Sequence, residues 1–146
     1  MGRELAEPEL TALGETLGKS LPPGAVVWLE GELGAGKTTL AQAIARGLGV
    51  ASRATSPSYT LVQRYPGLRG AVYHVDCFRL AQPDDAHDLD WESLQAGDAL
   101  FIEWPERAGA WAPPPTCRVR LEHVSDPVKR RLEVVGREWC VVGGEW

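Results

Sequence analysis

The sequence predicts an α/β fold in which a mixed, mainly parallel sheet is flanked by helices. Three observations lead to this prediction. A continuous apolar run at 25–29 is typical of a strand buried on both faces of a parallel sheet. A glycine-rich loop and a helical pattern follow it directly, and two later apolar runs, 71–76 and 99–103, each end on an acidic residue. A strand, a loop and a helix followed by further strands is the order of an α/β domain.

The length and composition of the chain favour one domain that spans residues 1–146. A chain of 146 residues is the size of a typical single domain, and a hydrophobic content of 44% excludes wholesale disorder. No apolar stretch approaches the ~18 residues of a membrane-spanning helix. The amino terminus carries charges where a signal peptide has an apolar core. We therefore expect a cytoplasmic protein that makes no membrane contact.

The charge and the cysteines argue against other classes of protein. A formal net charge of −5 argues against a surface that is a nucleic-acid footprint throughout. The three cysteines, Cys77, Cys117 and Cys140, are an odd number, and none belongs to a C-x-x-C pair. This pattern favours reduced thiols over a disulfide framework or a zinc site.

The first predicted element is a helix that begins at residues 7–9. Pro8 suits the first helical position, and the acidic residues on either side suit the positive end of the helix dipole. Leucines recur at helical spacing at positions 10, 13 and 17, so one face of this helix should pack on the core. The sequence LPPG at 21–24 ends the helix.

A strand and a second helix come next. The apolar run 25–29 contains two valines and forms the buried strand. After the glycine-rich loop, residues 38–46 are predicted to form a helix that ends at Gly47 and Gly49. A polar loop with a proline follows at 51–60.

Two hairpins are expected in the second half of the chain. Residues 59–65 and 71–76 flank the turn sequence PGLRG, which indicates a β-hairpin or two neighbouring strands. Residues 119–121 and 132–135 flank the turn sequence SDPVK in the same way.

Between these hairpins the sequence predicts a helix, a strand and an irregular segment. The acidic segment 81–97 should contain one helix before Gly97. Residues 99–103 form a short buried strand that ends on a carboxylate, and 105–115 is either helix or loop.

The glycine-rich loop carries the strongest functional signal. Residues 31–38 match the pattern G-x-x-x-x-G-K-[ST] in full. The glycines let several N–H groups point at one anion, and the following helix adds the positive end of its dipole. In such a loop Lys37 reaches the β- and γ-phosphates, and the Thr38 hydroxyl can bind Mg²⁺. The preceding strand and following helix complete the context of a P-loop NTPase domain. The predicted phosphate-binding residues are Gly31, Leu33, Gly34, Ala35, Gly36, Lys37, Thr38 and Thr39.

A P-loop enzyme needs a carboxylate at the end of a neighbouring strand to hold the metal or polarise water. Two candidates exist: Asp76 closes the run AVYHVD, and Glu103 closes the run ALFIE. Two such acids beside a complete P-loop indicate that at least one of them is functional.

Residues near these acids have alternative interpretations. His74 alternates with Asp76, so their side chains should share a face of the strand, and a structural role for His74 is favoured. Arg79 could neutralise phosphate or pair with Asp76. Arg130 and Arg131, in the late hairpin, could approach the nucleotide or tRNA, but solvated surface charges are favoured.

The loop TSPSYT has two interpretations. Its hydroxyls could sense a γ-phosphate as a switch loop does, or the segment could be a plain turn built from turn-forming residues. The hydroxyl-bearing residues concerned are Thr55, Ser56, Ser58 and Thr60.

Taken in order, four stretches resemble the TsaE family, the small ATPases of bacterial tRNA threonylcarbamoyladenosine biosynthesis. They are GELGAGKTTL at 31–40, SPSYTLVQRY at 56–65, YHVDCFRL at 73–80 and IEWPE at 102–106. The P-loop alone is shared with many families, whereas this combination is specific. Two departures are mild: Ser58 stands where threonine is commoner, and Phe78 stands where tyrosine is commoner.

The resemblance implies a role for each matching residue. Lys37 and the amides of the loop hold the phosphates of ATP, and Lys37 also serves catalysis. Thr38 and Glu103 ligate Mg²⁺. Asp76 is needed for hydrolysis, either as a group that supports the metal or as a base that orients water. Trp104 is the tryptophan of the I-E-W motif, and its role stays open between function and simple cover for the edge of the core.

The resemblance also implies a cellular function and partners. The family works with TsaD and TsaB, which transfer a threonylcarbamoyl group to the tRNA adenosine next to the anticodon. TsaE proteins do not perform that transfer; their slow hydrolysis of ATP resets or regulates the partner complex. We therefore expect a chain that is a monomer alone and meets tRNA only through this complex.

The sequence also bears on other classes of function. A small-molecule kinase also begins with a P-loop, but only the acidic segment 82–98 could form its acceptor subdomain, and its charge suits a phosphorylated acceptor poorly. Guanine recognition by an N-K-x-D motif is excluded because the chain contains no asparagine. A binding module gated by ATP stays close to the TsaE interpretation. An inert fold with a relict loop would show no nucleotide affinity.

Overall fold

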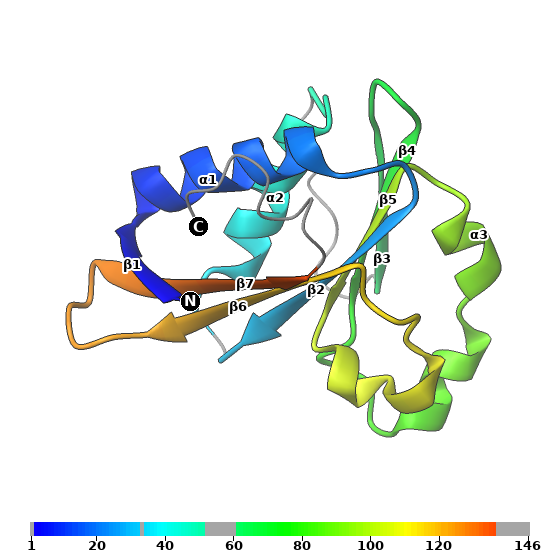
Figure 1. Ribbon diagram of the computed structural model, residues 1–146. Coiled ribbons are helices and arrows are strands. Elements are labelled where there is room, and N and C mark those ends of the chain that lie inside the picture. Colours follow the sequence, from blue (N-terminus) through cyan, green and yellow to red (C-terminus); the bar gives the residue numbers. More distant parts are fainter. Residues whose placement is uncertain (1, 33, 52–60, 137–146) are drawn as a thin grey trace.

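The fold is built on one seven-stranded sheet (Figure 1). The computed structural model describes residues 2–32, 34–51 and 61–136. The strands are β1 (Gly2–Ala6), β2 (Ala25–Gly31), β3 (Val62–Pro66), β4 (Ala71–Asp76), β5 (Ala99–Glu103), β6 (Cys117–His123) and β7 (Lys129–Gly136). The helices are α1 (Glu7–Ser20), α2 (Lys37–Gly47) and α3 (Trp91–Gln95), with 3₁₀ turns η1 (Pro83–Asp88), η2 (Pro105–Arg107) and η3 (Gly109–Trp111).

The centre of the sheet is parallel and its outer strands are antiparallel. The strand order is β1-β7-β6-β2-β5-β4-β3, in which β6, β2, β5 and β4 run parallel. The outer pairs β1–β7, β6–β7 and β3–β4 are antiparallel. The predicted α/β class with a mixed, mainly parallel sheet is confirmed.

Two layers cover the sheet. Helices α1 and α2 lie on one face, and η1, α3 and η3 lie on the other (Figure 1). The alternation of side chains in β5 shows the division, because Phe101 belongs to the core under α1 and α2 whereas Leu100 and Ile102 belong to the opposite core. All five residues of β5 are buried, as expected for a strand between two layers.

The two long helices approach each other through glycines. A Cβ atom on Gly18 of α1 would lie 2.1 Å from the Ile44 carbonyl oxygen of α2. A Cβ atom on Gly47 of α2 would lie 2.2 Å from the Glu15 carbonyl oxygen. The backbones therefore pack more closely here than side chains would allow, and this contact fixes α2 against α1.

Most predicted elements are confirmed. The first helix begins at Glu7 and ends at Ser20, and the Glu9 side chain accepts the Ala6 N–H at its start. The strand predicted at 25–29 extends to Gly31. Both hairpins form, as β3–β4 and β6–β7, and the second has longer strands than predicted.

The helix predicted within 81–97, before Gly97, is confirmed, and a 3₁₀ turn that was not predicted precedes it. The segment forms η1 and then the short helix α3. Asp90 separates them because its side chain accepts the Ser93 N–H and so starts α3 afresh. Residues 105–115, left open between helix and loop, form the turns η2 and η3 before the run of prolines.

Strand β1 was not predicted from the sequence. Only Leu5 of this short segment is buried in the core, so no alternation identified it. It forms because β7 offers an edge to pair with, and Leu5 lies opposite Arg130.

Two other expectations concern the cysteines and the absence of a membrane-spanning helix. Cys77 is a buried free thiol, as predicted, and burial raises its pKa to about 12. Cys140 lies outside the described residues. In the ranges that the structure describes, none of the helices combines the length and the apolar character that crossing a membrane requires.

The helix contact gives a stability test. Replacing Gly18 by alanine would raise helix propensity, but the new Cβ clashes with the backbone of α2. We expect Gly18→Ala to lower the free energy of unfolding by about 1–3 kcal/mol. Thr16→Ala on the exposed side of α1 should change it by less than about 0.5 kcal/mol. Urea unfolding measures both, and equal stability of the Gly18 variant and the wild type would contradict the close approach.

Candidate functional site

The predicted phosphate loop joins β2 to α2. Gly34 and Gly36 have φ angles of +79° and +99°, and Gly36 is the residue before the first helical position, Lys37. Only glycine adopts such angles without strain. Because Gly36 has no side chain to cap α2, the amides of the first turn are left to bind an anion. The strand, the loop and the helix occur as the motif predicts, while Leu33 lies outside the described residues.

Lys37 folds back over this loop. Its Nζ donates to the carbonyl oxygens of Gly31 (2.6 Å) and Glu32 (2.9 Å), and the residue is only 5% exposed. Burial lowers the pKa of Lys37, while the negative charges of Glu103 and Asp76 oppose that shift. The ammonium is thus held by carbonyl oxygens, which phosphate oxygens could replace.

The two predicted carboxylates meet at one edge of the sheet. Glu103 lies between Leu29 of β2 and Asp76 of β4 in the parallel register. Its Oε2 accepts hydrogen bonds from Thr38 Oγ1 (3.0 Å) and His74 Nε2 (2.5 Å). The structure therefore brings a motif hydroxyl and a predicted metal ligand into direct contact.

Glu103 is ionised although it is only 4% exposed. Burial raises the pKa of Glu103, but hydrogen bonds from His74 and Thr38 and the positive charge of Lys37 outweigh it and leave the pKa lowered. The carboxylate therefore keeps its charge inside the protein at neutral pH.

His74 and Asp76 face the same side of the sheet, as their alternation predicts. His74 contacts Glu103, and Asp76 lines the same pocket as Glu103. The structural role favoured for His74 is therefore to support Glu103, a charged side chain of the site. In the described part of the chain its Nδ1 atom is buried without a hydrogen-bond partner.

Asp76 lines a pocket of about 290 Å³ beside the first turn of α2. Its Oδ1 accepts the Phe78 N–H at 3.0 Å. Arg79 is exposed, and across residues 2–32, 34–51 and 61–136 no ion pair joins it to Asp76. The proposed pairing of these two residues is therefore not observed. The pocket is lined by Gly34, Gly36, Lys37, Thr38, Thr39, Asp76, Phe78, Glu103 and Trp104.

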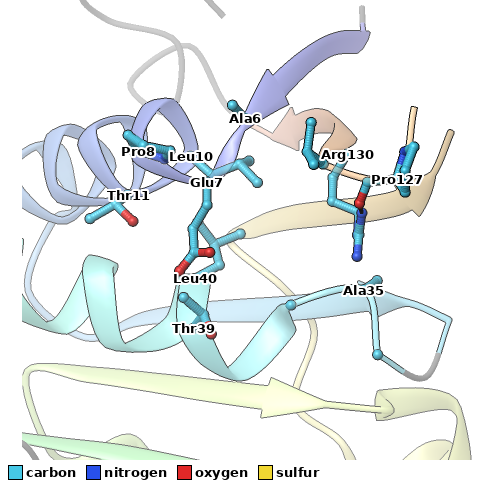
Figure 2. Close-up of a pocket in the computed structure, with 13 residues that line it drawn as sticks. Ala6, Glu7, Pro8, Leu10, Thr11, Ala35, Thr39, Leu40, Pro127 and Arg130 are labelled. Carbon is cyan, nitrogen blue, oxygen red and sulfur yellow. Dashed lines mark hydrogen bonds between the residues drawn. The ribbon is translucent and has the colours of Figure 1, made fainter. Parts of the chain in front are cut away.

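A second and larger pocket, of about 470 Å³, adjoins the loop on its other side. Figure 2 shows it between the start of α1, the start of α2 and the β6–β7 turn. Its walls are formed mainly by apolar side chains and by the backbone of the loop. The lining residues are Ala6, Glu7, Pro8, Leu10, Thr11, Gly34, Ala35, Gly36, Thr39, Leu40, Pro127, Val128 and Arg130.

The second pocket corrects one sequence-based prediction. Arg131 is exposed and lies 3.9 Å from Glu122, as expected of a surface charge. Arg130 is instead half-buried and reaches the pocket from β7 (Figure 2). Its Nη1 donates to the carbonyl oxygens of Pro127 (3.1 Å) and Lys129 (2.8 Å). The two arginines alternate along β7, so the sheet sends them to opposite faces.

The oxygen atoms at the loop suit a magnesium ion. Thr38 offers a hydroxyl, and Glu103 and Asp76 offer carboxylates, which are the hard ligands that Mg²⁺ prefers. Within the described ranges no group of three His, Cys, Asp or Glu side chains is placed to hold a metal. Mg²⁺ commonly takes one or two protein ligands and completes its shell with phosphate and water. The donor set therefore fits a magnesium ion that arrives with a nucleotide.

The structure describes only some of the remaining predicted residues. The hydroxyls of residues 55, 56, 58 and 60 lie outside the described residues, so the switch-loop prediction stays untested. Trp104 lines the smaller pocket and lies over Lys37, a contact that the sequence did not predict. The predicted loop residues, Thr38, Asp76 and Glu103 are otherwise brought together at one edge of the sheet.

Comparisons with known proteins agree on one family. Residues 5–132 match the sequence profile described as threonylcarbamoyl adenosine biosynthesis protein TsaE. A protein from Nostoc sp. named tRNA threonylcarbamoyladenosine biosynthesis protein TsaE is 41% identical over 109 residues, which cover 70% of this chain and 67% of that protein. A protein of the same name from Treponema pallidum is 38% identical over 114 residues, which cover 77% of this chain and 84% of that protein.

A solved structure shares the fold. The crystal structure of YdiB from Bacillus subtilis superposes with a TM-score of 0.68 at 25% sequence identity. The match covers 90% of this chain and 84% of the YdiB chain. The arrangement of sheet, loop and helices described above is therefore found in another protein.

The lowered pKa of Glu103 predicts a pH effect on stability. A carboxylate whose pKa is lower in the folded than in the unfolded chain stabilises the fold above its usual value of 4.5. That contribution is lost as pH falls through the folded value. The unfolding free energy of the wild type, relative to that of Glu103→Gln, should therefore decrease as pH falls below about 4.5.

Urea unfolding between pH 3 and pH 7 measures this difference. Thr38→Val removes one of the two hydrogen bonds to the carboxylate and should remove only part of the effect. An unfolding free energy of Glu103→Gln that follows the wild type in parallel at every pH would contradict the lowered pKa.

Proposed function

Because this chain belongs to the TsaE family of tRNA threonylcarbamoyladenosine biosynthesis, we propose that it binds ATP and Mg²⁺ and hydrolyses ATP slowly. In this proposal it is a single P-loop domain that acts in the cytoplasm with TsaD and TsaB, as an accessory ATPase rather than the transferase. The modified base is the tRNA adenosine next to the anticodon. One observation carries the proposal: the phosphate loop, Thr38, Glu103 and Asp76 converge at one edge of the sheet.

The loop supplies the phosphate contacts of the proposed site. Its amides and the start of α2 bind anions without any side chain, and Lys37 adds a buried positive charge. The Nζ atom now bonds the carbonyl oxygens of Gly31 and Glu32. We infer that the β- and γ-phosphates of ATP take over those contacts, because charged acceptors make the stronger hydrogen bonds.

The larger pocket supplies room for the nucleoside. It begins at Gly34 and Gly36, so a ligand with its phosphates in the loop would extend directly into it. Its volume of about 470 Å³ lies in the usual range for small-molecule sites. Leu10, Leu40 and Val128 provide apolar walls for a base. The shape and lining support a nucleotide rather than inorganic phosphate as the ligand.

Thr38 and Glu103 are the residues that we assign to Mg²⁺. Bound there with ATP, the ion would neutralise phosphate charge. The hydrogen bond with His74 holds the Glu103 carboxylate in position. Because the pKa of Glu103 is lowered, the carboxylate is also ionised before any ligand binds.

Asp76 is the residue that we assign to the attacking water. It lines the pocket beside Glu103 while Glu103 is engaged by His74 and Thr38. One oxygen of Asp76 accepts the Phe78 N–H, which fixes the carboxylate and leaves its other oxygen to bind water.

The composition of the smaller pocket supports slow hydrolysis by the chain alone. Of the described residues that line it, Lys37 is the cation, and none is an arginine. P-loop enzymes without an arginine in place for the transition state turn over slowly until a partner provides one or reorders the site. This fits an accessory role in which a partner complex controls turnover.

Binding and turnover should separate between two variants. We expect Lys37→Ala to weaken ATP binding by at least about tenfold, because a buried charge-assisted contact is lost. Asp76→Asn should keep ATP affinity within about threefold and lower the hydrolysis rate by about a hundredfold or more. Calorimetric titration and phosphate release measure the two effects, with the exposed Asp88→Asn as the control. Wild-type hydrolysis by the Asp76 variant would exclude Asp76 from the reaction.

The magnesium assignment has a separate test. Glu103→Gln keeps the size of the side chain but removes its charge, so we expect ATP binding to require about tenfold more Mg²⁺ for half-saturation. Glu106→Gln, a neighbouring acid outside the smaller pocket, should leave the Mg²⁺ titration unchanged. If Glu103→Gln also titrates as the wild type does, the ligand role moves to another residue.

A further inference from the structure

Trp104 occupies an unusual place between the strand that carries Glu103 and the loop that carries Lys37. Its indole ring lies over the Lys37 ammonium, with 4.4 Å between Nζ and the ring centroid. The ring also lines the smaller pocket. The sequence left its role open, and nothing in the proposed binding and hydrolysis of ATP uses it so far.

The backbone at Trp104 is strained. Its φ and ψ angles are +55° and +49°, and among the residues that the structure describes it is the only non-glycine with positive φ. A bulky residue adopts this left-handed conformation only at a cost in free energy. The following residue, Pro105, adds to the strain because proline favours an extended conformation in the residue before it. Glycine would adopt this turn without cost, so the tryptophan side chain offsets the strain by what it contacts.

The ammonium beneath the ring belongs to a buried side chain. Lys37 is 5% exposed, and it contacts the carbonyl oxygens of Gly31 and Glu32 and the face of Trp104. A buried cation gains more from an aromatic face than a cation at the surface does. The ring therefore contributes directly to where the ammonium lies.

The ring itself is held by its neighbours. The Phe78 ring lies 5.2 Å from it at an angle of 49°, and the Arg107 guanidinium lies 5.3 Å from its centroid. Arg107 Nη1 also donates to the Phe78 carbonyl oxygen at 3.0 Å. These contacts keep the indole from swinging away, so it presents a fixed face to Lys37.

We propose that Trp104 is a positioning residue for Lys37, whose ring holds the ammonium at the phosphate loop so that the phosphates of ATP meet an ordered cation. A free lysine side chain has many rotamers, and the loss of this rotamer entropy opposes binding. The ring removes part of that cost in advance. The inference rests on the proposed binding of ATP, and it adds a residue that acts through Lys37 rather than on the phosphates.

A double-mutant cycle on ATP affinity tests this role without any measurement of turnover. The four proteins are the wild type, Trp104→Leu, Lys37→Met and the double variant, titrated with ATP by calorimetry. We expect Trp104→Leu to weaken binding about 3- to 30-fold when Lys37 is present, as expected for loss of a cation–π contact. In the Lys37→Met background the same change should alter affinity less than about twofold. Trp111→Leu, which removes a partly exposed tryptophan that meets the His87 ring edge to face, is the matched control and should bind as the wild type does.

Each result decides between the possible roles. Equal weakening by Trp104→Leu in both backgrounds would mean a general structural effect and would overturn the proposal, as would no weakening at all. If Trp104→Leu does not fold, Trp104→Phe carries the test, since a smaller ring should weaken binding less and only when Lys37 is present. Failure of the wild type to bind ATP would overturn the proposed function as well. Wild-type binding that weakens in Lys37→Met without coupling to Trp104 would overturn this inference alone.

Discussion

Three neighbouring parallel strands, β2, β5 and β4, end in one row at the edge of the sheet where α2 begins. Glu103 stands in the middle of this row, with Leu29 on one side and Asp76 on the other. Parallel strands bring their carboxyl ends to the same edge of the sheet. The loop after β2 and the acids at the ends of β5 and β4 therefore lie next to one another. A shift of β5 by one residue would turn Glu103 toward the opposite core and Ile102 toward α2. The phosphate loop, the metal ligands and the catalytic acid of the proposed function all depend on this register.

The same register buries the charge of Glu103, which its neighbours stabilise by hydrogen bonds. A buried carboxylate is costly unless it is hydrogen-bonded, and both Glu103 and Lys37 are buried. His74 reaches Glu103 from the adjacent strand, and Thr38 reaches it from α2. Lys37 finds carbonyl oxygens and an indole ring. The charges are therefore ordered before a ligand binds, which is the condition for tight binding of phosphates and for a defined catalytic geometry.

What the sequence could predict was local. The glycine pattern, the apolar run before it and the helix after it are adjacent in the chain, so the phosphate loop was identified without knowledge of the fold. The acids at 76 and 103 could be named because each ends an apolar run, although only the register shows that they are neighbours.

The missed features arise from contacts between distant segments. Strand β1 exists because β7 pairs with it, and the same pairing carries Arg130 to the larger pocket. The turn η1 was not expected, and the helix predicted in 81–97 begins only after Asp90 caps it. The contact between Trp104 and Lys37 depends on a left-handed residue before a proline, which no sequence pattern used here indicates. Pairing partners and strained turns are thus the parts that need the structure.

If the chain acts with TsaD and TsaB as proposed, ATP bound at this site should control its association with them. The most direct measurement is the affinity of the purified chain for the TsaD–TsaB pair, with and without ATP and Mg²⁺, under conditions where hydrolysis is negligible. We expect association that is at least about tenfold tighter with ATP than without nucleotide. An affinity that is the same with and without ATP, or no association in either case, would contradict it.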